Sequence, residues 1–254
     1  MVSRFRHGFN VLFDEESDPG LVSIQTPAVP LHPFGIEVES IDGAPAVGTP
    51  SHAEAGTIRF DDGFRVLLAK DAVEELGIKP YTPEKRERAL SRSPIPEQLL
   101  EEERAKRGQD TFRSEIDAIL KRWLETLNPE PLIDLIGLGT GSTPAGDDVL
   151  VGLIAGLTAL ENVAHEAKAA LRGLRSAPRE ARRNQTSLAS AQMMIAAALD
   201  GAFSEPLCSL VVALGREDAD DAEIQGFTER LVALGASSGR MMLRGLLAAL
   251  APGF

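Results

Sequence analysis

A run of small and acidic residues in the middle of the chain is the stretch best suited to chemistry. It reads Leu135-Ile-Gly-Leu-Gly-Thr-Gly-Ser-Thr-Pro-Ala-Gly-Asp-Asp148, and an apolar segment from Val149 to Leu160 follows it. Glycine lets a ligand approach the main chain closely. Free N–H groups at the start of a helix, together with the positive end of the helix dipole, bind anions. The string therefore predicts a loop that leads into a buried helix and offers its amides to a small anion.

Two adjacent carboxylates stand where this helix would begin. Thr143 followed by Pro144 is typical of an N-cap and a first helical turn, which places Asp147 and Asp148 near the helix start. Side chains of adjacent helical residues point about 100° apart, so we expect one aspartate to face the ligand and the other to support it. Either can act as a base, orient an amide nitrogen or bind Mg²⁺. The plain alternative is that the pair only places negative charge near the positive end of the dipole.

A second loop of small residues, Leu234-Gly-Ala-Ser-Ser-Gly239, precedes a closing helix predicted from Arg240 to Leu250. It again exposes amides at a helix start, so the two loops together predict a shared anion pocket. The alternative is that Gly235 only ends one helix and that Ser237 or Ser238 only caps the next.

Several well-known kinds of site are excluded. No Gly-Lys-Ser/Thr follows the glycines, as a Walker A loop requires. The surrounding sequence is helical rather than βαβ, unlike a Rossmann domain. There is no metal-type His pair and no nucleophile elbow. The single cysteine, Cys208, excludes an internal disulfide and a cysteine-rich zinc site.

Composition and net charge limit the class of protein and its partners. The 254 residues are 43% hydrophobic and 25% charged, as in an ordinary globular protein of one large or two modest domains. A net charge of −12 argues against nucleic acid and anionic lipid as partners. The N-terminus has no apolar signal-peptide core, and the longest apolar run, from Val149, is too short to span a bilayer. We therefore expect a cytoplasmic location with no membrane partner.

Residues 1–78 predict a small β domain, sandwich or barrel-like. Phe5, Phe9, Val11 and Phe13 are mostly spaced by two, the period of a half-buried strand. Other strands are expected at Leu21–Thr26, at Gly35–Glu39, and in a hairpin of Thr57–Phe60 and Phe64–Leu68 with Gly63 in its turn.

The rest of the chain predicts helices. Residues 79–95 are rich in proline and charge, which indicates a partly helical linker. In the domain expected over residues 96–254, apolar residues from Phe112 to Leu127 recur at helical spacing. Gly152 and Gly156 in the apolar helix each cost about 1 kcal/mol relative to alanine, which indicates that another backbone packs closely there. The predicted fold class is therefore α+β, a small N-terminal β domain followed by a mainly α-helical C-terminal domain.

The string from Gly137 to Asp148 resembles the signature of the AllH-like proteins, formerly a bacterial domain of unknown function. That family is associated with the oxamate carbamoyltransferase complex of anaerobic allantoin breakdown. One departure is Ser142, where the family pattern has an apolar residue, often leucine. The resemblance covers most of the chain and includes Phe5…Phe9-Asn10, Thr186-Ser187 through Gly201, and Gly235-Ala-Ser-Ser-Gly239…Gly245.

The resemblance implies one subunit of a carbamoyltransferase complex that converts oxalurate and phosphate to oxamate and carbamoyl phosphate, or the reverse. Its expected partners are the other subunits and a small anionic metabolite: carbamoyl phosphate, phosphate or oxalurate. Amides at Gly139 to Thr143 would hold the dianion, and preorganised N–H donors stabilise charge on a carbonyl oxygen. The resemblance implies no particular cofactor, the metal requirement stays open, and Mg²⁺ on the catalytic candidates Asp147 and Asp148 is the metal considered. The ligand-binding candidates are Gly137, Gly139, Gly141, Ser142, Thr143, Gly146, Thr186, Ser187, Ser237, Ser238 and Gly239.

Two other classes of function fit the same residues. In the first, the chain is a stand-alone regulatory protein that binds a nucleotide or phosphorylated metabolite. In the second, it is an assembly scaffold in which the aspartates play no part.

Overall fold

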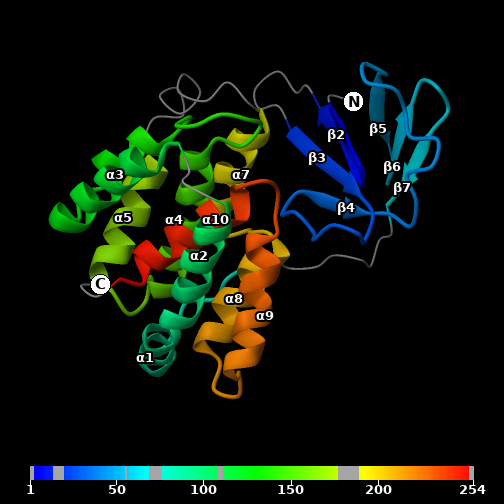
Figure 1. Cartoon of the computed structure of the whole chain (residues 1–254). Coiled ribbons are helices and arrows are strands. Elements are labelled where there is room, and N and C mark those ends of the chain that lie inside the picture. The colour runs from blue at the N-terminus through cyan, green and yellow to red at the C-terminus, as the bar shows by residue number, and fades with distance from the viewer. Residues whose placement is uncertain are drawn as a thin grey trace. The chain divides into compact units, whose positions relative to one another are not determined.

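The computed structural model describes residues 3–13, 20–54, 56–68, 76–107, 111–176 and 189–251. The chain divides into two compact units, Met1–Leu76 and Gly77–Phe254. Strands make up the first unit and helices the second (Figure 1), which confirms the predicted α+β class. Within these residues, no helix has the length and apolarity needed to cross a membrane.

The N-terminal unit contains two small sheets. The predicted hairpin is confirmed, and Gly63 adopts a φ of +93° in its turn. In the first sheet β1 (Ser3–Phe5), β2 (Gly8–Phe13) and β3 (Gly20–Gln25) are antiparallel neighbours, and β4 (Gly35–Glu37) runs parallel to β3. The second sheet is antiparallel and consists of β5 (Ser51–Glu54), β6 (Thr57–Phe60) and β7 (Arg65–Leu67).

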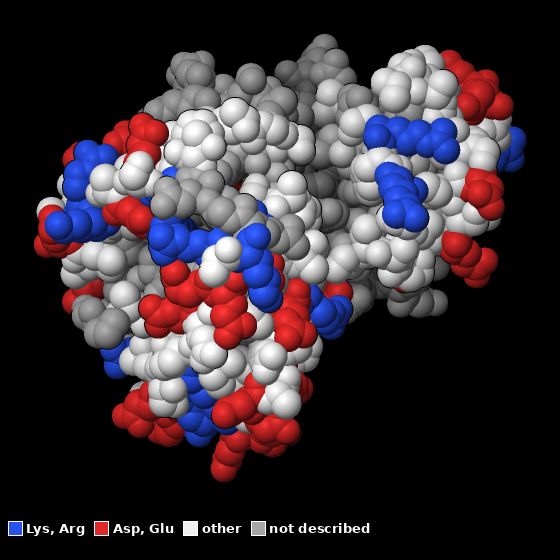
Figure 2. All heavy atoms as spheres, in the orientation of Figure 1, with Lys and Arg blue, Asp and Glu red and all other residues white. Residues whose placement is uncertain are grey.

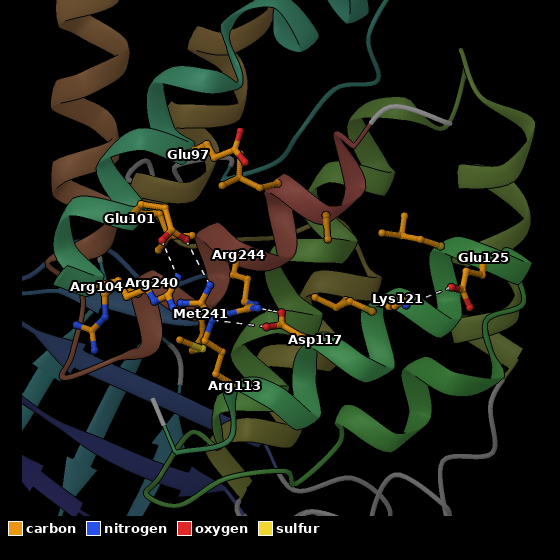
Figure 3. A pocket seen from close by; sticks show the side chains of 15 residues that line it. Glu97, Glu101, Arg104, Arg113, Asp117, Lys121, Glu125, Arg240, Met241 and Arg244 are labelled. Carbon is orange, nitrogen blue, oxygen red and sulfur yellow. Dashed lines mark hydrogen bonds and ion pairs between the residues drawn. The ribbon is translucent and has the colours of Figure 1, made fainter. Parts of the chain in front are cut away.

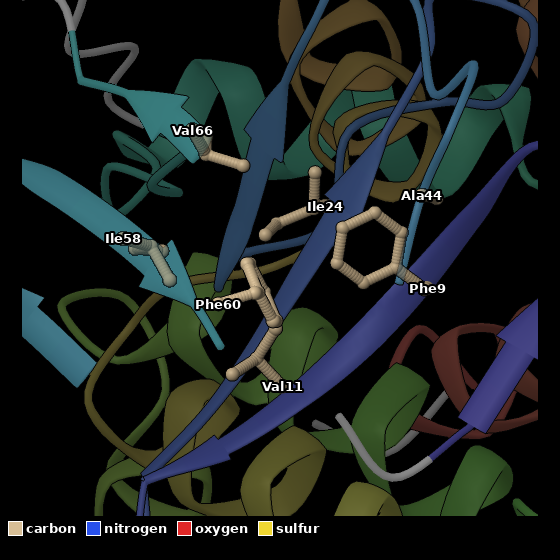
Figure 4. Packing of buried hydrophobic residues seen from close by; sticks show 7 residues of the cluster. All are labelled: Phe9, Val11, Ile24, Ala44, Ile58, Phe60 and Val66. Carbon is tan, nitrogen blue, oxygen red and sulfur yellow. The ribbon is translucent and has the colours of Figure 1, made fainter. Parts of the chain in front are cut away.

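One apolar core serves both sheets, because alternate side chains of β2, β3 and β6, together with Val66 of β7, point toward it. Three of its aromatic rings, those of Phe9, Phe60 and Phe64, pack edge to face, with distances of 5.8–5.9 Å between ring centroids. This is the sandwich-like packing that the sequence predicts. The buried members of the core are Phe9, Val11, Ile24, Ala44, Ile58, Phe60 and Val66 (Figure 4).

The C-terminal unit is a bundle of helices around α4. The amphipathic segment after Phe112 forms α3, whose buried face includes Ile116, Ile119 and Trp123, as predicted. The elements are α1 (Pro83–Arg92), α2 (Pro94–Arg107), α3 (Arg113–Thr126), the 3-10 helix η1 (Glu130–Leu135), α4 (Ala145–Leu160), α5 (His165–Ser176), α7 (Ala189–Leu199), α8 (Glu205–Gly215), α9 (Asp221–Val232) and α10 (Ser238–Ala249).

The charged segment 79–95, predicted as a linker, contains α1 and the first residues of α2. Tyr81 is buried and donates its hydroxyl to the carbonyl oxygen of Val211 in α8. Arg92 donates to the carbonyl oxygen of Ala219 at 2.7 Å, just beyond the end of α8. The segment is thus bonded to the C-terminal half of α8 and the residues after it.

Helix α4 is buried along its length from Gly146, as its uniformly apolar sequence predicts. Its backbone lies against that of α10. A methyl group added at Gly152 would overlap the carbonyl oxygen of Met242, and one added at Gly245 would overlap that of Val149. The expected close approach of a second backbone is therefore present, and glycine is required on both helices.

We expect Gly152→Ala to lower the free energy of unfolding of the helical unit by about 2 kcal/mol or more. The overlap with Met242 should outweigh the gain of about 1 kcal/mol in helix propensity. The matched control is Gly226→Ala in α9, where no described atom lies within 4 Å of the added carbon. The free energy of unfolding of the control should rise by up to about 1 kcal/mol. Urea denaturation followed by circular dichroism measures both, and equal effects would contradict the close approach.

Candidate functional site

The loop between η1 and α4 turns sharply at its glycines. Gly137, Gly139 and Gly141 adopt φ values of +77°, +129° and +98°, a region that side chains disfavour. The amide of Gly146 donates to the carbonyl oxygen of Leu138 at 2.7 Å, which folds the loop back onto the start of α4. The loop conformation therefore explains the three alternating glycines.

The middle of this loop is exposed and contains main-chain N–H groups without a hydrogen-bond partner in the described residues. Thr140, Gly141 and Ser142 are exposed. Among the described residues, the amides of Gly139, Thr140 and Gly141 have no hydrogen-bond partner. Such unbonded donors ahead of a helix are what an anion site needs.

The helix begins one residue later than predicted. Pro144 is the N-cap of α4, and no side chain bonds to the first turn. The prediction that Thr143 caps the helix is therefore wrong. Its hydroxyl instead lies 2.9 Å from the hydroxyl of Ser238 and is hydrogen-bonded to it.

Helices α4 and α10 run parallel, so their N-termini lie at the same end. Their contacts advance together along both helices, from Thr143 beside Ser238 to Gly152 beside Met242. The positive ends of the two helix dipoles therefore coincide where the two loops meet, and both favour an anion there.

Asp147 holds the loop in place. Its Oδ1 accepts a hydrogen bond from the amide of Gly137 at 2.9 Å, and the residue is 1% exposed. A charge-assisted bond of this kind is stronger than a neutral one. Asp147 thus ties the first residue of the loop to the first turn of α4.

Asp148 has a different environment and is also 1% exposed. Burial raises its pKa to about 8, and the charge of Asp147 adds to this, while the hydroxyls of Ser238 and Thr143 favour the ionised form. Its Oδ2 is buried without a hydrogen-bond partner in the described part of the chain. A carboxyl with such a pKa can give or take a proton near neutral pH.

Other candidate residues have a packing role or lie outside the described residues. Gly146 and Gly239 are buried, and a methyl group at either would overlap a carbonyl oxygen of η1 or α9, respectively. Ser237 is the N-cap of α10 without a side-chain bond. Thr186 and Ser187 lie outside the described residues.

The Mg²⁺ hypothesis has no further support from neighbouring side chains. Among the residues that the structure describes, no group of three or more His, Cys, Asp or Glu side chains is placed to hold a metal ion. The two aspartates also have separate environments, so Mg²⁺ at either would need water or other kinds of oxygen ligand.

Sequence reasoning missed Arg240. This side chain is only 7% exposed and donates to the carbonyl oxygen of Ala236 at 2.8 Å. It thereby holds the second loop against the start of α10. The available signal was a charged residue directly after the loop, at the start of an otherwise apolar helix.

Replacing Asp148 with asparagine should stabilise the protein at high pH. The pKa of Asp148 rises from 3.8 to about 8 on folding. Below about pH 4 Asp148 is protonated in both the folded and the unfolded chain, so its burial costs no ionisation energy. As the pH rises to about 8 it ionises in the unfolded chain first, so the free energy of unfolding falls. We expect the melting temperature of Asp148→Asn to exceed that of the wild type by several degrees at pH 8–9 and to equal it near pH 4. Asp134→Asn, at an exposed position, is the control. A loss of stability at every pH would contradict the assignment.

The comparisons with known proteins agree with the predicted resemblance. Residues 135–250 match the protein family described as oxamate carbamoyltransferase subunit AllH. The resemblance to AllH-like proteins is thereby confirmed for the segment that holds both loops, α4 and α10. No curated protein and no solved structure shows significant similarity to the chain.

Proposed function

We propose that this chain is a subunit of a carbamoyltransferase complex and that a small anionic substrate binds where the loops before α4 and α10 meet. The match of residues 135–250 to the AllH family supports the first part. One observation carries the second part. Thr143, Asp148 and Ser238 converge at two helix N-termini, beside an exposed loop whose amides have no hydrogen-bond partner in the described residues.

The substrate's phosphate is held by main-chain groups. The amides of the exposed residues Thr140 and Gly141 donate to its oxygens, and both helix dipoles favour its charge. The hydroxyls of Thr143 and Ser238 are half-buried and are hydrogen-bonded to each other. No side-chain cation is needed in this arrangement.

The reaction requires one proton transfer. In the phosphorolysis of oxalurate, a phosphate oxygen forms a bond to the carbamoyl carbon, and the bond from that carbon to the oxamate nitrogen breaks. The leaving nitrogen must take up a proton. Asp148, protonated at neutral pH, supplies it through the hydroxyls of Ser238 and Thr143, because the carboxyl itself is covered. The proton that the attacking hydrogen phosphate loses then returns to Asp148. The same path accepts the proton in the reverse direction.

Asp147 has a positioning role. Its bond to the amide of Gly137 fixes the loop that holds the phosphate. Preorganised donors lower the barrier because they need no rearrangement as charge develops.

The proposal predicts a specific pH profile. The chain would be produced with the subunits encoded beside its gene and supplied with oxalurate and phosphate, and carbamoyl phosphate would be followed by ³¹P NMR. Because phosphorolysis needs protonated Asp148, the rate should fall above pH about 8. Asp148→Asn should lower kcat by about 10²–10⁴-fold and remove this fall.

The exposed Asp134→Asn variant is the control and should keep both kcat and the pH profile. An unchanged kcat in Asp148→Asn would rule out the proton path. If the complete set of folded subunits makes no carbamoyl phosphate, carbamoyl transfer itself is wrong. Calorimetry that finds ATP binding without affinity for carbamoyl phosphate would favour the regulatory alternative.

A further inference from the structure

Asp148, Thr143 and Ser238 form a cluster of one carboxyl and two hydroxyl groups, here called the proton network. The hydroxyls of Thr143 and Ser238 lie 2.9 Å apart, and either one can donate to the other. Both also favour the ionised form of the Asp148 carboxyl through hydrogen bonding. Asp148 is 1% exposed, and its Oδ2 has no hydrogen-bond partner in the described residues. Because solvent barely reaches this carboxyl, the protons of the three groups decide what the network offers to a ligand.

The charged groups on the surrounding elements differ in which way they face. Asp147 acts on Asp148 and disfavours a second ionised carboxylate beside it. On α10, Ser238 faces α4, whereas Arg240 points about 200° further around the helix. Arg240 lines a separate cleft of about 470 Å³ between α2, α3 and α10 (Figure 3). The charged residues of η1 and of the last turn of α9 are exposed: Glu130, Asp134, Glu229 and Arg230.

A count of protons shows what the network offers when Asp148 is neutral. Each hydroxyl has one proton to donate, and a protonated carboxyl adds a third. One proton joins the two hydroxyls, and a second joins the carboxyl to a hydroxyl. The third is free to turn toward a ligand, so the neutral network donates a hydrogen bond outward.

The ionised network has no proton to spare. Two protons remain, and one of them joins the two hydroxyls. The other is donated to the carboxylate, since a buried charge without a hydrogen bond is costly. The hydroxyl oxygens keep unused lone pairs, so the network now only accepts hydrogen bonds. The loss of one proton thus changes a donor into an acceptor.

We propose that the anion site beside this network distinguishes oxyanions by whether they carry a proton of their own. Neutral Asp148 suits a dianion that only accepts hydrogen bonds, such as sulfate or the phosphate group of carbamoyl phosphate. Ionised Asp148 suits hydrogen phosphate, whose hydroxyl donates to the network while its other oxygens accept from the loop amides. The inference rests on the proposed anion site, but it does not require carbamoyl transfer.

Hydrogen phosphate and sulfate form a matched pair of ligands, because both are tetrahedral dianions and they differ by one proton. The chain carries a net charge of −12, and Figure 2 shows acidic side chains among basic ones on the visible face of the helical unit. General electrostatic repulsion acts alike on two ions of equal charge, so it cancels in the ratio of their affinities. That ratio therefore reports whether the network donates or accepts.

Isothermal titration calorimetry of the full chain with sulfate and with inorganic phosphate measures this ratio. The titrations run from about pH 7 to about pH 9.5, on either side of the pKa of Asp148, which burial raises to about 8. Phosphate carries at least one proton over this range, and sulfate carries none. We expect the affinity for sulfate to fall by about tenfold or more relative to that for phosphate, the effect of one hydrogen bond to a charged group.

Asp148→Asn removes the titrating group, and its amide always has protons to donate. In this variant the ratio of affinities should stay constant over the same pH range. The matched control is Asp134→Asn, the same change at an exposed carboxylate, which should keep the pH dependence of the wild type.

A ratio that stays constant with pH in the wild type would overturn the proposal, although binding of both ions would still support the anion site. No saturable binding of either ion would remove the anion site itself, and this proposal with it. If Asp148→Asn fails to fold, sulfate titrations of the wild type in two buffers of different ionisation enthalpy decide. Near pH 9, sulfate binding should take up about one proton, and an uptake near zero counts against the proposal.

Discussion

Close contact between the backbones of α4 and α10 determines the arrangement of the helical unit. Gly152 and Gly245 allow each helix to approach the carbonyl oxygens of the other. Because the two helices run parallel, this contact also places both N-termini at one end. Thr143 and Ser238, 95 residues apart in sequence, meet there through their hydroxyls. The candidate site thus follows from helix packing and not from the glycine loop alone.

The same packing explains why two adjacent aspartates differ. Both are buried in the first turn of α4, but only Asp147 reaches back to the amide of Gly137. Asp148 points toward the start of α10, where two hydroxyls offset only part of the cost of burying a charge. Burial without an opposite charge disfavours ionisation. One carboxylate therefore stabilises the loop, and the other retains a proton that chemistry can use.

Much of this could be predicted from the sequence, because local patterns report local structure. The apolar run after Asp148 predicts a buried helix, and Gly152 predicts a close backbone neighbour. Strand β5 (Ser51–Glu54) was not predicted, since it is short, largely exposed and without alternating apolar residues. The bond between Thr143 and Ser238 was not predicted either. Nothing near Thr143 in sequence distinguishes a helix cap from a partner on a distant helix, and only the register of α4 against α10 decides between them.

The chain carries a net charge of −12, and α10 brings positive potential to two places in it. Its N-terminus meets that of α4, where main-chain dipoles supply the potential without a charged side chain. Its arginine-bearing face, with Arg240 and Arg244, lines the cleft toward α2 and α3, while Gly245 lies against α4. Arg240 also holds the carbonyl oxygen of Ala236 in the loop before α10. Arg240 therefore connects its own face of α10 to the loop that lies beside Asp148.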